Sequence, residues 1–126
     1  MEKEVALWLN KAKDDLRVAE SNFKTKEIEA AAFFCQQAVE KALKALFLYE
    51  KKGIVPQSHS LIYLATNTSI PKKFYSFLKE LTPKFIGTRY PDASVDLPSR
   101  IYDKQITERL LKQSKEVLQW IETKFS

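Results

Sequence analysis

The chain has 126 residues and a formal net charge of +5, and this length predicts a single domain spanning residues 1–126. Hydrophobic residues make up 44% of the chain and charged residues 29%, a balance that excludes intrinsic disorder. Two glycines and one cysteine exclude a glycine-rich phosphate-binding loop and a thiolate-based zinc site, and we predict no metal site around the single histidine. No apolar run approaches the ~20 residues of a membrane span and the N-terminus is charged, so we expect a cytoplasmic protein that does not enter a membrane.

Three long segments of the chain have helical periodicity. The first spans about residues 2–24 and the second about residues 26–51, while the last begins at Asp103, whose side chain suits an N-cap. No segment alternates strictly between apolar and polar residues, as a half-buried strand would. We therefore predict an all-α protein. Its architecture is an antiparallel up-and-down helical bundle with long helices 1, 2 and the last, and with two short helices between them.

The two short helices are predicted in the middle of the chain. Residues 61–66 form the first, with Ser58 or Ser60 as its cap, and Pro71 suits the first turn of the second. A connection over about residues 82–102 follows, in which one glycine and two prolines block a continuous helix. Connections longer than about 12–15 residues are uncommon and often functional. This one is either functional or a packing loop anchored by its apolar residues.

The positive charge is concentrated in the middle third of the chain. Residues 1–50 carry 8 basic and 9 acidic side chains, residues 51–92 carry 7 and 2, and residues 93–126 carry 6 and 5. The three segments therefore have net charges of −1, +5 and +1, so the middle one accounts for the excess. It is either a solvated basic surface or a site for phosphate or nucleic acid.

The second long helix carries a narrow polar strip on an otherwise apolar surface. Its members share one helical meridian at the spacing i, i+3, i+4 and i+7: Gln37, Glu40, Lys41 and Lys44. The apolar surface, which includes Cys35, makes this helix central or places it against a partner. The strip is either satisfied internally, with Glu40 reaching Lys44, or one wall of a polar groove or subunit interface.

Two further groups are candidates for ligand contact. His59 lies between two serines at a predicted helix start, where it either makes a structural hydrogen bond, contacts a ligand or acts as a base. Arg89 can bind a phosphate through two hydrogen bonds, and the ring of Tyr90 offers a face on which a base can stack. The alternative for that group is a turn in which Arg89 pairs with Asp92 or Glu40.

Three motifs in this order resemble the HEPN domain of bacteria and archaea: CQQAVEKALKALF, the lone histidine in SHSL, and TRYPDA. The resemblance covers essentially the full chain. It implies a helical bundle that forms homodimers, binds a nucleotide such as ATP or a minimal nucleotidyltransferase partner, and belongs to a toxin–antitoxin-like system. It places the family's site on the strip from Gln37 to Lys44, on His59 and on the group from Arg89 to Asp92.

The sequence departs from the HEPN relatives that cleave RNA. Those metal-independent ribonucleases share the motif Arg-x4-6-His, whereas no arginine lies in that window before His59. Lys52 stands there instead, and its ammonium lacks the planar fork of a guanidinium. We therefore predict no catalytic residue and a module that works by binding. The alternatives are a ribonuclease toxin that uses His59 with Lys52 or Arg89, and a purely structural interaction subunit.

Overall fold

The computed structural model describes residues 2–89 and 103–125, and the side chains of those residues apart from 83–89. Within these ranges every regular element is helical, and no helix is long and apolar enough to cross a membrane. The elements in chain order are α1 (Lys3–Lys24), α2 (Ile28–Lys51), α3 (Leu61–Thr66), the 3-10 turn η1 (Lys72–Phe74), α4 (Tyr75–Arg89) and α6 (Lys104–Thr123). The predicted all-α class is confirmed, and so are the positions of the long helices.

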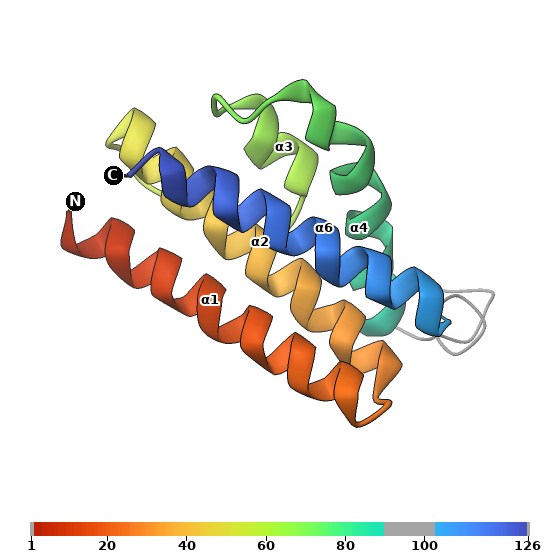
Figure 1. The fold of residues 1–126 in the computed structure, drawn as a ribbon. Coiled ribbons are helices and arrows are strands. Elements are labelled where there is room, and N and C mark those ends of the chain that lie inside the picture. The colour runs from red at the N-terminus through yellow and green to blue at the C-terminus, as the bar shows by residue number, and fades with distance from the viewer. Residues whose placement is uncertain (1, 90–102, 126) are drawn as a thin grey trace.

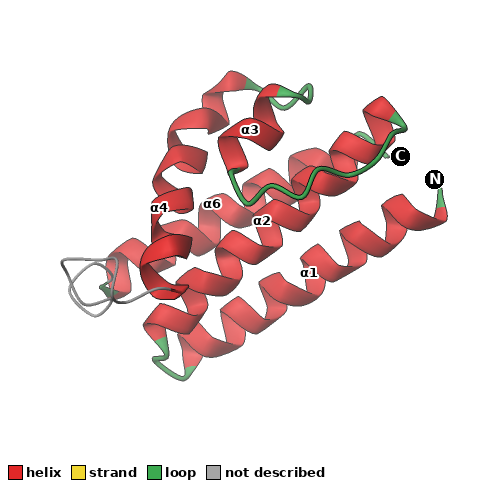
Figure 2. Ribbon diagram, turned by 180° about the vertical axis from the view of Figure 1, so that it is seen from behind, coloured by secondary structure: helices red, strands yellow, loops and turns green. Residues whose placement is uncertain are grey.

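The helices are arranged as an up-and-down bundle around α2. Helices α1 and α2 form a long antiparallel hairpin, and α6 lies along both of them (Figure 1). Helices α3 and α4 cover the other side of α2, so that α2 contacts each of the four remaining α-helices of the described chain. The loop between α2 and α3 then runs back along the surface of α2 (Figure 2).

The core follows from the apolar surface of α2. Four alanines of α2 are fully buried and keep that surface narrow, which lets neighbouring helices approach closely: Ala31, Ala38, Ala42 and Ala45. Cys35 is also fully buried, as its place on the apolar side predicts, and burial raises the pKa of its thiol to about 12. Helix α2 is therefore central in the bundle, which is one of the two placements that its apolar surface indicated.

The short elements and the last helix begin at caps that the sequence predicts. Ser60 is the cap of α3, where its Oγ accepts a hydrogen bond from the backbone N–H of Tyr63 at 3.2 Å. Pro71 immediately precedes η1, which leads directly into α4. At α6 the side chain of Asp103 accepts from the backbone N–H of Ile106 at 2.7 Å.

The expected connection over residues 82–102 is wrong in its first part. Helix α4 continues through Pro83 and Gly87 to Arg89, and residues 90–102 lie outside the described part of the chain. A proline inside a helix costs about 3 kcal/mol and a glycine about 1 kcal/mol, which tertiary packing routinely outweighs. Here two leucines of the preceding turns, Leu78 and Leu81, are fully buried and hold α4 in place.

Candidate functional site

The polar strip of α2 contains a buried ion pair. Glu40 is 5% exposed and Lys44 is 7% exposed, and Lys44 Nζ lies 2.9 Å from Glu40 Oε2. Of the two alternatives for the strip, the ion pair between Glu40 and Lys44 is therefore observed. Lys44 Nζ also lies 5.5 Å from the ring centroid of Trp8 on α1, within the range of a cation–π contact. Trp8 therefore forms one wall of this cluster.

His59 joins the same cluster from the loop that runs back along α2 (Figure 2). Its Nδ1 lies 3.2 Å from Glu40 Oε1 and 3.3 Å from Glu40 Oε2. A carboxylate can only accept, so this contact requires the proton on Nδ1 and fixes the orientation of the ring. The His59 side chain is 66% exposed, whereas that of Glu40 is 7% exposed. An accessible imidazole is thus anchored on a buried carboxylate.

Gln36 connects the two halves of the cluster and was missed by the sequence interpretation. It is fully buried, and its Nε2 donates to Glu40 Oε1 at 3.1 Å and to the backbone oxygen of His59 at 3.5 Å. Its Oε1 accepts from Gln37 Nε2 at 2.9 Å. The available signal was the i, i+4 spacing from Gln36 to Glu40, which allows two side chains on one helix to meet.

The rest of the predicted strip points elsewhere. Lys41 forms an ion pair with Asp15 of α1, so it belongs to the contact between the two hairpin helices. Gln37 touches the cluster only through Gln36 among the described contacts. The strip is therefore divided: Glu40 contacts both Lys44 and His59, whereas Lys41 pairs with α1. This division follows from the path of α1, which the periodicity of α2 does not contain.

The predicted group around Arg89 is only partly described. Arg89 is the last residue of α4, and its side chain lies outside the described set. Tyr90 and Asp92 lie outside the described residues altogether. Contact of these three residues with the cluster therefore stays a prediction.

The cluster suits hydrogen bonding and proton chemistry. The charges of Glu40 and Lys44 compensate each other where little water reaches them, and this strengthens each polar contact. His59 and Gln37 lie at its solvent side. Within the described residues no group of three histidine, cysteine or acidic side chains could hold a metal ion.

Comparison with known proteins shows the family of this bundle. Residues 5–124 match the HEPN domain, and the chain therefore belongs to the HEPN family. A protein of Methanocaldococcus jannaschii named "Putative toxin MJ1304" is 29% identical over 94% of this chain and 86% of its own.

Two solved structures share the fold along their whole length. The crystal structure of TT1696 from Thermus thermophilus is 30% identical with a TM-score of 0.86, covering 98% of this chain and 99% of that one. The structure of ST0689, described as an archaeal HEPN homologue, has a TM-score of 0.81 and covers 100% of both chains. At 24% identity this second likeness concerns the fold alone.

Proposed function

We propose that this chain is the HEPN module of a toxin–antitoxin-like pair and that it works by binding, in the cytoplasm, through the cluster around Glu40 and His59. Its membership of the HEPN family and its likeness to a relative named as a toxin support this assignment. The site is the surface at which α1, α2 and the loop before α3 meet. The proposal adds no catalytic residue.

One observation carries the proposal: an imidazole that is 66% exposed is held by a carboxylate that is 7% exposed. Exposed side chains normally sample several rotamers, and fixing one costs conformational entropy. Burying a carboxylate is also unfavourable unless its partners satisfy it. Because the folded protein already orders the imidazole of His59 and buries the carboxylate that holds it, this group is oriented before a ligand binds, which raises the affinity.

The proposed ligand is a nucleotide such as ATP, and the proposed partner is a minimal nucleotidyltransferase. The chain has a formal net charge of +5, which favours association with a phosphate-bearing molecule. The proposed active form is a homodimer that pairs through the long helices, so that two such sites would lie on one assembly.

The test measures partner binding and nucleotide binding separately. Light scattering after gel filtration, with and without a purified minimal nucleotidyltransferase, reports the homodimer and the complex. A thermal shift with ATP reports the nucleotide, because a ligand that binds only the folded state raises the midpoint. His59→Ala should weaken the binding of the nucleotidyltransferase, of ATP or of both. The exposed control Lys79→Ala should weaken the binding of neither molecule. A wild-type chain that binds neither molecule contradicts the proposal.

A second candidate function is a metal-independent ribonuclease. The observation in its favour is that Glu40 contacts Nδ1, which makes Nε2 the basic nitrogen of the neutral His59 ring, as a general base requires. End-labelled single-stranded RNA, incubated with chelator and pure protein beside His59→Ala, tests it. Cleavage that disappears in the variant assigns the nuclease function, and intact RNA in both samples rejects it.

A further inference from the structure

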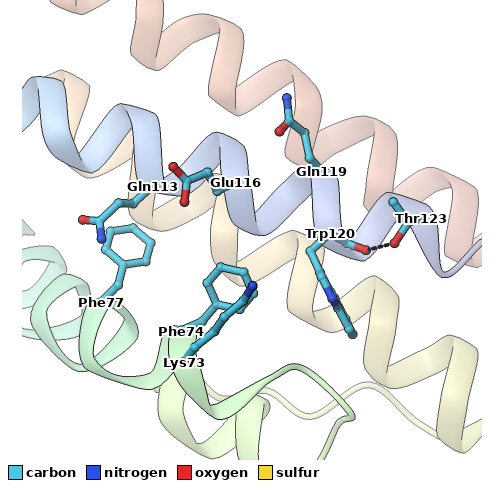
Figure 3. Close-up of a pocket in the computed structure, with 8 residues that line it drawn as sticks. All are labelled: Lys73, Phe74, Phe77, Gln113, Glu116, Gln119, Trp120 and Thr123. Atoms are coloured by element: carbon cyan, nitrogen blue, oxygen red, sulfur yellow. Dashed lines mark hydrogen bonds between the residues drawn. The ribbon is translucent and has the colours of Figure 1, made fainter.

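A cavity lies away from the Glu40–His59 cluster, between η1, the start of α4, and the second half of α6. Its volume is about 440 Å³. Figure 3 shows Phe74 and Phe77 on one side and Gln113, Glu116, Gln119 and Trp120 of α6 on the other. The α6 residues that line it extend from Gln113 to Thr123, which at about 1.5 Å per residue is roughly 15 Å of helix. The groove is therefore long enough for a short peptide segment.

The aromatic rings of this groove already attract cations. Lys73 Nζ lies 5.2 Å from the ring centroid of Phe74, and Lys124 Nζ lies 5.0 Å from that of Trp120. Both distances are within the range of cation–π contacts. Phe74 and Trp120 are only half-buried, so a visiting side chain can reach them. Phe77, at 5% exposed, forms part of the floor.

The α6 wall supplies acceptors. Glu116 is exposed, and within the described part of the chain its carboxylate takes part in no ion pair or hydrogen bond. One end of the same wall already binds a guanidinium of this chain, because Arg109 Nη1 donates to Gln113 Oε1 at 2.9 Å. Arg109 also grips Glu80 with two hydrogen bonds of 2.8 and 2.6 Å, which ties α6 to α4 beside the groove.

We propose that this groove binds the arginine side chain of a protein partner. The guanidinium would stack between Phe74 and Trp120 and donate to the carboxylate of Glu116. A planar guanidinium suits both contacts, whereas an ammonium cannot stack and donate in a fork at once. The two rings favour a cation, because each already lies within cation–π distance of an ammonium, and Glu116 supplies a carboxylate in the same lining. Lys73 and Lys124 are exposed competitors on Phe74 and Trp120, and the incoming guanidinium displaces them.

The test uses two capped tripeptides, acetyl-Gly-Arg-Gly-amide and its lysine counterpart, with fluorescence of Trp120 as the readout. Trp8→Phe removes the other tryptophan signal, because the chain has two tryptophans. We expect saturable binding of the arginine peptide that Glu116→Gln weakens by about tenfold or more. Lys73→Ala should tighten binding by about threefold, since it removes the competing ammonium. The lysine peptide should bind more weakly than the arginine peptide.

The sign of the Lys73→Ala effect decides between a cation and an anion as the guest. If AMP binds the groove and Lys73→Ala weakens that binding, the proposal is overturned in favour of a nucleotide. If a tryptophan tripeptide binds as well as the arginine peptide, the groove recognises apolar side chains and not a guanidinium. If neither peptide binds saturably, the groove is not a binding site. His59→Ala should leave peptide binding unchanged, so this result is independent of the proposed function. Circular dichroism checks that Glu116→Gln, a surface change, remains folded.

Discussion

Glu40 and His59 are separated by nineteen positions in the sequence, and Glu40 Oε1 lies 3.2 Å from His59 Nδ1. The contact exists because the loop after α2 reverses direction and runs back along the helix it leaves (Figure 2). It places the single histidine of the chain on a carboxylate that is itself paired with Lys44. The following predictions test this network and the bundle that supports it.

Gln36→Leu should destabilise the protein by about 1–3 kcal/mol. The change removes the amide that donates to Glu40 and to the His59 backbone, and it leaves buried acceptors without a partner. Urea denaturation measures the loss, with the exposed Gln119→Leu as control, which should change stability by less than about 0.5 kcal/mol. The NMR signal of the His59 ring should shift in the Gln36 variant, and an unchanged signal would show that Gln36 does not position this histidine.

Lys44→Met should cost about 3 kcal/mol of folding free energy, because it leaves the carboxylate of Glu40 buried without its ammonium partner. Glu40→Gln together with Lys44→Met should recover at least half of this loss, since no charge then stays uncompensated. Chemical denaturation of both variants and of Glu40→Gln completes a double-mutant cycle. Equal destabilisation by the single and double variants would mean that packing, rather than charge, dominates at this position.

Cys35 should resist thiol reagents in the folded protein at pH 8 and react rapidly in urea. Burial raises the pKa of its thiol from 9.0 to about 12, so above pH 9 the unfolded chain loses this proton while the folded chain keeps it. Stability should therefore fall between about pH 9 and 12, by at most about 1.4 kcal/mol per pH unit from this group. Cys35→Ala should lack this part of the fall, and identical pH profiles of the two proteins would refute the assignment.

Asp103→Ala should destabilise the protein by about 1 kcal/mol, because the carboxylate accepts from the backbone N–H of Ile106 at the start of α6. Asp103→Asn keeps a hydrogen-bond acceptor at the same place, so it should lose only a small part of the stability that Asp103→Ala loses. Thermal denaturation of the two variants compares them directly. A loss of the same size in both would show that the negative charge near the helix N-terminus, and not the hydrogen bond, is what matters.

The helices were predictable because their signals are local. Spacing of apolar residues defined α1, α2 and α6, and the caps at Ser60 and Asp103 marked where two helices begin. The end of α4 was not predictable in this way. Pro83 and Gly87 are unfavourable in a helix, but buried Leu78 and Leu81 anchor α4 against the bundle, and burial against other elements cannot be read from neighbouring residues.

By itself the sequence determined the helical class, and it offered a central α2 and a Glu40–Lys44 pair as alternatives, because periods of three and four residues decide which side chains of one helix can meet. Only the tertiary structure decided that His59 joins that pair, that Gln36 ties both together, and that Lys41 turns instead to Asp15. Each of those contacts depends on how a loop or a neighbouring helix passes α2. The paths of loops and helices are set by the burial of apolar surface over the whole core. No single sequence motif encodes that burial.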